Sequence, residues 1–214
     1  MRMRRKSLAP EERQSLSRGA AEVLVSSVPW RQAGIVALYM AARGEVDTSA
    51  LLADAWQHGK TVLLPACSRT EAGKMCFMSC AAPDELCAGP FGILQPPLSE
   101  DESEFLLLNA NNDLLDDGTT GLPPAASGVL LVPDLIIVPA LAFDLSGLRL
   151  GMGGGYYDRL LALPRYRNCL RLGLAYSFQL VSRLPSEPWD MPVHAICTEQ
   201  GMLWIHKHGC LPPG

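Results

Sequence analysis

The residues best suited to chemistry lie in one glycine-rich segment, residues 149–159, which reads Arg-Leu-Gly-Met-Gly-Gly-Gly-Tyr-Tyr-Asp-Arg. Its glycines let the backbone approach a ligand closely, and successive amide N–H groups followed by a helix start form a cradle for an anion. Phosphate is the anion that we expect such a site to bind.

Two commoner phosphate loops do not match this segment. A Walker loop has Lys and then Ser or Thr after its last glycine, whereas Tyr156 follows Gly155. The dinucleotide-binding fingerprint requires glycine where Tyr156 stands. A glycine-rich turn without function is the remaining alternative, and the neighbouring Arg149, Tyr156 and Asp158 argue against it.

The pattern before the glycines predicts the elements that position them. A helix is predicted from about residue 10 to 26, because proline and two acids stand in its first turn. Residues 34–40 form a continuous apolar run, typical of a strand buried on both faces. Residues 48–58 are predicted as a helix with Thr48 as N-cap, and residues 61–65 as the next buried strand. This order implies a parallel pair with a right-handed crossover.

The rest of the chain continues the alternation. Strands are predicted at residues 74–79, 134–142, 171–176 and 195–197, and helices at 156–163 and 178–183. We therefore expect a single α/β domain over residues 1–214, with three layers and a mostly parallel central sheet flanked by helices. Residues 97–128 are rich in acids, Asn, Gly and Pro, and we expect a surface insertion that lies away from any phosphate site.

Composition and charge exclude several classes of protein. Of the 214 residues, 48% are hydrophobic and 19% are charged, which describes a globular chain and excludes wholesale disorder. A net charge of −4 argues against nucleic-acid binding. The seven cysteines form no Cys-x-x-Cys pair, as expected of reduced thiols. No apolar stretch reaches the ~18 residues of a membrane span, so we expect a cytoplasmic protein without membrane partners.

The segment Arg-Leu-Gly-x-Gly-x-Gly-Tyr-Tyr-Asp resembles the signature of 5-formyltetrahydrofolate cyclo-ligases, also called methenyltetrahydrofolate synthetases. Other segments are similar to that family in order and spacing. They include the early helix start at residues 8–13, the loop at 39–48, the segment Phe-Gly-Ile-Leu-Gln-Pro at 91–96, and the C-terminal Gly173-Leu174-Ala175-Tyr176 with Gln179, Asp190, Thr198 and Glu199. The resemblance covers most of the chain outside the predicted insertion.

The resemblance implies an enzyme that couples ATP hydrolysis to closure of 5-formyltetrahydrofolate into 5,10-methenyltetrahydrofolate. It implies a monomer whose ligands are ATP, Mg²⁺ and a reduced folate. By matched position, Arg149 and Tyr156 are the catalytic candidates, and Asp158 and Asp190 are the Mg²⁺ candidates. The implied ATP-binding residues are Arg149, Leu150, Gly151, Met152, Gly153, Gly154, Gly155, Tyr156 and Tyr157. The implied folate-binding residues are Met40, Glu45, Met152 and Tyr156.

The sequence also leaves other interpretations open. One is a catalytically impaired relative that binds folate or nucleotide. Another is a sugar-phosphate or coenzyme A protein with a similar loop, in which case the matches around Glu45, Phe91 and Asp190 would be accidental. Family members usually begin with a further helical stretch whose Lys and Arg touch ATP. Either the start of this sequence is mis-assigned, or its own basic cluster contacts the phosphates instead. The alternative for the cluster is a solvated helix start. Its members are Arg2, Arg4, Arg5 and Lys6.

Overall fold

A seven-stranded sheet runs through the middle of the protein, in a computed structural model that describes residues 1–99 and 131–205. The strand order is β12-β11-β9-β6-β1-β2-β3, with the inner strands parallel and each edge strand antiparallel to its neighbour. The strands are β1 (Ile35–Ala37), β2 (Thr61–Cys67), β3 (Met75–Ser79), β6 (Leu135–Val138), β9 (Leu170–Leu174), β11 (Ala195–Thr198) and β12 (Gly201–Trp204).

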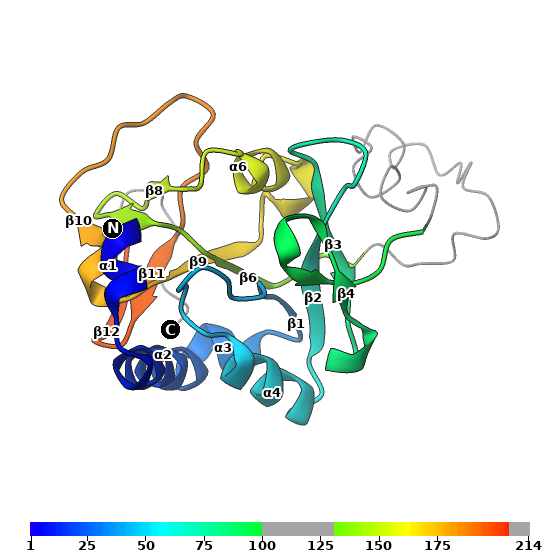
Figure 1. The fold of residues 1–214 in the computed structure, drawn as a ribbon, viewed down its shortest axis with the longest axis horizontal. Coiled ribbons are helices and arrows are strands. Elements are labelled where there is room, and N and C mark those ends of the chain that lie inside the picture. The colour runs from blue at the N-terminus through cyan, green and yellow to red at the C-terminus, as the bar shows by residue number, and fades with distance from the viewer. Residues whose placement is uncertain (100–130, 206–214) are drawn as a thin grey trace.

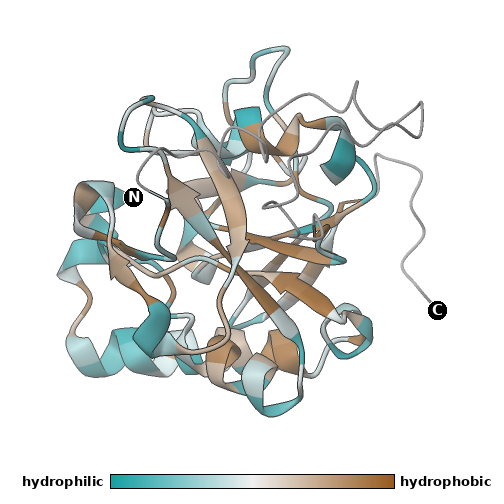
Figure 2. Cartoon of the chain, turned by 90° about the vertical axis from the view of Figure 1, so that its right-hand side faces the viewer, coloured by the Kyte–Doolittle hydropathy of each residue, from teal (hydrophilic) through white to brown (hydrophobic). Residues whose placement is uncertain are grey.

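Helices cover both faces of this sheet, which confirms the predicted three-layer α/β architecture (Figure 1). One face carries α2 (Pro10–Val25), α3 (Val28–Gln32) and α4 (Ser49–Gln57), and the other carries α6 (Tyr156–Leu161). Side chains of β6 alternate between two apolar cores, with Leu135 and Ile137 facing α2 and α4 and Ile136 and Val138 facing α6. Strand β6 is buried on both sides, and all four of its residues are accordingly hydrophobic (Figure 2).

Shorter elements complete the described chain. The first helix is α1 (Arg2–Ser7). A three-stranded sheet consists of β10 (Leu180–Val181), β7 (Ala142–Asp144) and β8 (Arg149–Leu150), and a two-stranded sheet pairs β4 (Cys87–Ala88) with β5 (Leu94–Gln95). Single 3-10 turns lie at Pro83–Glu85, Pro90–Gly92, Pro164–Tyr166 and Ser177–Gln179. Within residues 1–99 and 131–205, no helix has the length and apolarity that a membrane crossing requires.

The order of the strands determines where a ligand can bind. Strand β1 pairs with β2 on one side and with β6 on the other. The chain therefore adds β2 and β3 on one side of β1, and β6, β9, β11 and β12 on the opposite side. Open α/β sheets bind ligands beyond the carboxyl ends of strands at such a switch point. The predicted folate-side loop, residues 39–48, begins at that end of β1.

Two predicted elements are wrong. Residues 134–142 are not one strand, because the chain leaves the central sheet after Val138 and Ala142 pairs with Leu150 in the three-stranded sheet. Residues 178–183 are not a helix, because a 3-10 turn leads directly into β10. The Gln179 side chain points inward and donates hydrogen bonds to the carbonyls of Ala140 (2.9 Å) and Leu141 (3.0 Å). The predicted insertion lies outside the described residues except for residues 97–99.

Thr48 stands at the predicted N-cap position of α4, but its hydroxyl does not cap the helix. It donates to the carbonyl of Tyr39 at 2.6 Å, which ties the start of α4 to the end of β1. The carboxylate of Asp47 instead accepts from the Ser49 N–H at 2.9 Å. The Tyr39 hydroxyl in turn donates to the carbonyl of Val46 at 2.9 Å, so the loop between β1 and α4 is bonded internally from both ends.

The close packing of Gly173 against Phe143 predicts that a methyl group added at Gly173 destabilises the protein. A Cβ on Gly173 in β9 would lie 2.6 Å from the Phe143 ring, and both residues are in the interior. We expect Gly173→Ala to lower the free energy of unfolding by about 1–3 kcal/mol, measured by urea denaturation. Gly34→Ala is the matched control, because its Cβ meets only the Asp134 carboxylate at 3.7 Å. Equal stability of the two variants would contradict this packing.

Candidate functional site

The glycine-rich loop between β8 and α6 presents a row of unused hydrogen-bond donors. Within the described residues, none of the backbone N–H groups of residues 151–155 donates to another group of the protein. Gly153 and Gly155 have φ values of +90° and +62°, a region that favours glycine. Unpaired amides at the surface can instead bind an anion, as the sequence predicts for this segment.

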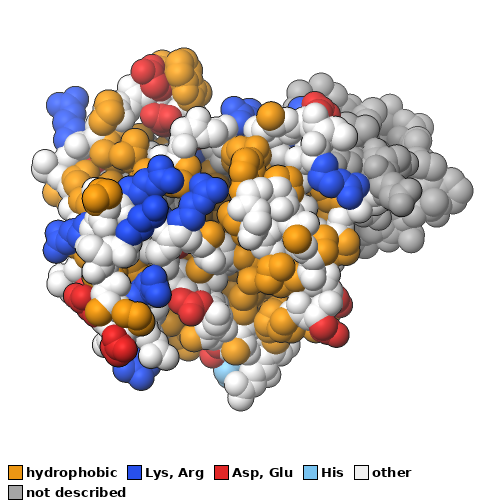
Figure 3. All heavy atoms as spheres, in the orientation of Figure 1, with side chains coloured by type: hydrophobic (Ala, Val, Ile, Leu, Met, Phe, Trp, Pro, Cys, Tyr) orange, Lys and Arg blue, Asp and Glu red, His pale blue; other side chains and the backbone are white. Residues whose placement is uncertain are grey.

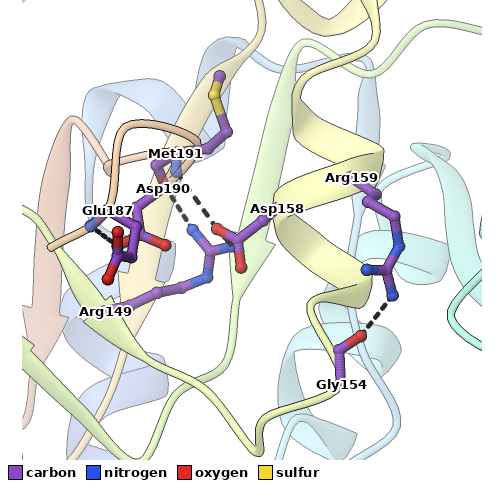
Figure 4. A network of polar contacts seen from close by, with 7 residues as sticks. All are labelled: Arg149, Gly154, Asp158, Arg159, Glu187, Asp190 and Met191. Atoms are coloured by element: carbon purple, nitrogen blue, oxygen red, sulfur yellow. Dashed lines mark hydrogen bonds and ion pairs between the residues drawn. The ribbon is translucent and has the colours of Figure 1, made fainter.

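Arg149 holds the loop at its start and at its end. Its side chain is 4% exposed, and Nη2 lies 2.6 Å from Oδ1 of Asp158, in the first turn of α6 after the loop. Nη1 donates to the carbonyl of Met191, whose own N–H donates to the same Asp158 oxygen at 3.2 Å (Figure 4). Burial lowers the pKa of Arg149, and the charge of Asp158 opposes that shift. The loop is therefore closed by a partly buried ion pair.

The two predicted metal ligands lie on either side of Arg149 (Figure 4). Oδ1 of Asp158 is occupied by Arg149 and Met191, and Oδ2 of Asp190 accepts from the Glu187 N–H at 2.8 Å. The other oxygen of each carboxylate has no hydrogen bond within the described part of the chain. That part contains no group of three or more His, Cys, Asp or Glu that could hold a metal by itself. A divalent cation here would need oxygens from a ligand such as a phosphate.

Glu45 lies in the loop that follows β1. Its Oε2 accepts from the Ala42 N–H at 3.0 Å, and its backbone carbonyl accepts from the Tyr176 hydroxyl at 3.1 Å. The side chain is half-buried, and burial raises the pKa of this carboxyl group. Met40, also half-buried, packs against the core beside α4. The structure thus places these two of the four predicted folate-binding residues beyond the carboxyl end of β1.

Tyr157 lies between the β1 loop and the glycine-rich loop. Its hydroxyl is buried and has no hydrogen-bond partner among residues 1–99 and 131–205, although it belongs to a half-buried residue. Burial raises the pKa of Tyr157, and the groups that interact electrostatically with it are Glu45, Cys67 and Arg149. This residue therefore connects the candidate folate side with the candidate phosphate side. The sequence assigned Tyr157 to phosphate binding and gave no signal of its buried hydroxyl.

The other aromatic and apolar candidates lie at the rim of the loop. Tyr156 packs edge-on against Phe91, with ring centroids 6.0 Å apart, so the segment at 91–96 lies beside the loop. Met152 is 46% exposed. Arg159, which the sequence did not single out, donates from Nε to the carbonyl of Gly73 at 2.9 Å and from Nη2 to the carbonyl of Gly154. It therefore ties the loop to the β2–β3 turn.

The N-terminal basic cluster divides into exposed and buried members. Arg2 and Lys6 are exposed, and the guanidinium of Arg4 lies 4.4 Å from the centroid of the Phe178 ring. Arg5 is 1% exposed, so the interpretation of the cluster as a solvated helix start is wrong for this residue. Contact of the cluster with phosphates remains a prediction.

A mostly parallel central sheet flanked by helices, with a glycine-rich loop whose amides have no acceptor among the described residues, defines the class of this protein: an open-sheet α/β protein. The family model of the 5-formyltetrahydrofolate cyclo-ligase family matches residues 1–116 and 118–199. The chain belongs to the 5-formyltetrahydrofolate cyclo-ligase family.

Individual relatives agree with this assignment over nearly the whole chain. The sequence is 33% identical over 198 residues to the 5-formyltetrahydrofolate cyclo-ligase of Escherichia coli K12, covering 92% of this chain and 96% of the relative. It is 30% identical over 192 residues to the Haemophilus influenzae protein of the same description, with 90% of each covered. The solved structure of Aquifex aeolicus 5,10-methenyltetrahydrofolate synthetase is similar with a TM-score of 0.71 and 31% identity, covering 99% of this chain and 92% of the other.

Thiol reactivity tests the burial of the region around Tyr157. Burial raises the pKa of Cys67 and of Cys169 to about 11 each, whereas Cys87 is exposed. The thiolate is the reactive form, so at pH 8 iodoacetamide should alkylate Cys87 well before Cys67 or Cys169 in the native protein. Peptide mass spectrometry over time measures the order, and unfolding in urea should abolish it. Early labelling of Cys67 would contradict the closed packing beside Tyr157.

Proposed function

We propose that this protein is an enzyme that uses ATP to close 5-formyltetrahydrofolate into 5,10-methenyltetrahydrofolate, releasing ADP and phosphate. It is a ligase of the 5-formyltetrahydrofolate cyclo-ligase family. The observation that carries the proposal is the row of amides at residues 151–155 that have no acceptor among residues 1–99 and 131–205. This row lies beside the buried Arg149, in a chain matched by cyclo-ligases over nearly all of its length. The monomeric state and the cytoplasmic location remain predictions of the sequence.

The phosphate side of the proposed site is the segment from Arg149 to Tyr157. The amides of the loop donate to the phosphate oxygens, and glycines allow the close approach that this requires. Arg149 is engaged by Asp158 and Met191, so its role is to fix the loop and to place a positive charge beneath the phosphates. Tyr156 closes the rim of the site together with Phe91.

The folate side consists of Met40, Glu45, Met152 and Tyr156. An ionised carboxylate accepts hydrogen bonds at both oxygens, and the amino-pyrimidinone edge of a pterin offers adjacent N–H donors. Oε2 of Glu45 already accepts from Ala42, which orients the carboxylate, while Oε1 has no hydrogen bond within the described residues. The exposed Met152 and the Tyr156 ring supply apolar surface for a flat ligand.

The proposed chemistry explains the need for ATP. The formyl group on N5 is an amide, and its oxygen is a poor leaving group. Transfer of the γ-phosphoryl group to that oxygen forms an imidate-like phosphate and releases ADP. The neighbouring secondary amine, N10, attacks the carbon, and the oxygen departs with phosphate as the amine loses its proton. The protein contributes mainly position and charge, as in other phosphoryl transfers.

Asp158 and Asp190 fit a magnesium ion shared with the phosphates. Each keeps one carboxylate oxygen without a hydrogen bond among the described residues, and both lie beside Arg149 next to the loop. Mg²⁺ is usually held by one or two carboxylates together with substrate phosphates, which is the donor set that these residues can complete. When bound, the ion neutralises charge on the transferred phosphoryl group.

Turnover tests the function directly. Purified protein mixed with 5-formyltetrahydrofolate and Mg-ATP should generate the near-ultraviolet absorbance of the methenyl product, with one ADP released per product. Omission of ATP is the control and should abolish the signal, because the formyl oxygen then has no route of departure. Binding of both ligands without turnover would indicate a catalytically impaired relative. Absence of folate binding would refute the proposed substrate.

Magnesium dependence tests the two carboxylates. We expect Asp190→Asn and Asp158→Asn each to raise the Mg²⁺ concentration for half-maximal activity by roughly ten-fold, because each removes an anionic ligand. Glu187→Gln is the matched control, since this exposed carboxylate stands in the same turn as Asp190 and should not alter the titration. Thermal unfolding separates a metal role from a structural one, especially for Asp158. An unchanged titration in both variants would remove them from the metal site.

A further inference from the structure

A buried charge in the first helix has no role in the site as described so far. Arg5 is among the largest fully buried side chains of the described residues. No carboxylate in that part of the chain lies within 4.0 Å of its guanidinium. Lys and Arg side chains gather on the face of the molecule where α1 lies (Figure 3), but Arg5 itself is 1% exposed. Burying an unpaired charge is costly, so compensating contacts must hold it.

The contacts of Arg5 join the carboxyl ends of two central strands. Nη1 donates to the carbonyl of Ala140, just beyond β6, at 3.1 Å. Nη2 donates to the carbonyl of Arg43, in the loop after β1, at 3.2 Å. The same Ala140 oxygen also accepts from the Gln179 amide. Arg5 therefore links the segment that follows β6 to the loop after β1, which carries Glu45.

The backbone around Arg43 depends on this contact. Arg43 and Gly44 have φ values of +53° and +77°, and a non-glycine residue in that region is strained unless its surroundings hold it there. A Cβ on Gly44 would lie 3.2 Å from the backbone oxygen of Arg5, so helix α1 packs directly on this turn. The turn directly precedes Glu45, and its conformation sets the direction of that carboxylate.

Arg5 also acts on Glu45 through its charge. The charged or titratable groups that face Glu45 are Arg5 from α1, Tyr157 from α6, and Tyr39 and Arg43 from the preceding loop. Burial raises the pKa of both tyrosines, so they are neutral near pH 7. Burial likewise raises the pKa of Glu45, while a backbone hydrogen bond and then Arg5 and Arg43 lower it. Arg5 thus favours the ionised carboxylate.

We infer that Arg5 is a positioning residue for the folate site, which fixes the Arg43–Gly44 turn and keeps Glu45 as a carboxylate able to accept from the pterin. This inference rests on the proposed function, because it assigns Glu45 to the folate. It makes α1 a part of substrate recognition although Arg5 itself is shielded from any ligand by its burial.

Two substitutions of Arg5 distinguish the effect of its charge from the effect of its hydrogen bonds. Arg5→Gln should raise KM for 5-formyltetrahydrofolate about ten-fold and leave KM for ATP within about two-fold, because one lost hydrogen bond lies in the loop that carries Glu45 and the other, to Ala140, lies outside the glycine-rich loop. It should also move the acid limb of the kcat/KM profile for folate to higher pH, since Glu45 without Arg5 takes up its proton at higher pH. Arg5→Lys keeps the charge but not the paired hydrogen bonds, so KM should rise without that shift.

Arg18→Gln is the matched control, because Arg18 is an exposed arginine on the neighbouring helix α2. Parallel losses of thermal stability, of kcat and of affinity for both ligands would reduce Arg5 to a structural role and overturn the inference. So would a selective rise in KM for ATP, or kinetics equal to those of Arg18→Gln. If Arg5→Gln does not fold, an unchanged KM for folate in Arg5→Lys overturns it. Wild-type turnover tests the proposed function separately, and without turnover the same comparison is made by equilibrium binding of 5-formyltetrahydrofolate.

Discussion

The ion pair between Arg149 and Asp158 is the interaction on which the candidate site depends. The two residues flank the glycine-rich loop, and the 2.6 Å contact brings the ends of the loop together. The backbone of Met191 completes the closure by accepting from one partner and donating to the other. A partly buried pair of this kind adds little net stability, but loss of either partner leaves an uncompensated charge. Its main consequence is geometric, because it holds in one place a row of amides that have no acceptor within the described part of the chain.

The second part of the site is built from side chains that bond to backbone carbonyls. Tyr176 reaches the carbonyl of Glu45, Gln179 reaches Ala140, and Arg5 reaches both Ala140 and Arg43. A parallel sheet brings the carboxyl ends of its strands together, but the loops that follow the strands lack the regular backbone hydrogen bonds of paired strands. These polar side chains supply hydrogen bonds to the loop carbonyls instead, which explains how an irregular segment such as residues 39–48 is held in one conformation.

Much of this arrangement could be predicted from the sequence. The strands at β1 and β2 and the helices α2 and α4 follow from apolar runs and breakers, and they are confirmed. The error at residues 134–142 has a physical cause, because a continuous apolar run does not show where a chain leaves one sheet for another. The burial of Arg5 could not be predicted either. Its acceptors lie 38 and 135 residues away, and a basic run near a terminus has the composition of a solvated helix.

The position of β1 also determines when the fold can be completed. This strand lies between β2, which follows it closely, and β6, which is separated from it by nearly a hundred residues. Until β6 is synthesised, one edge of β1 has no partner, and the Ala140 acceptor of Arg5 does not yet exist. A nascent chain therefore carries an open, apolar strand edge and an undocked first helix while the residues between β1 and β6 are added. During that interval it presents to chaperones and to other nascent chains a surface that the finished protein no longer has.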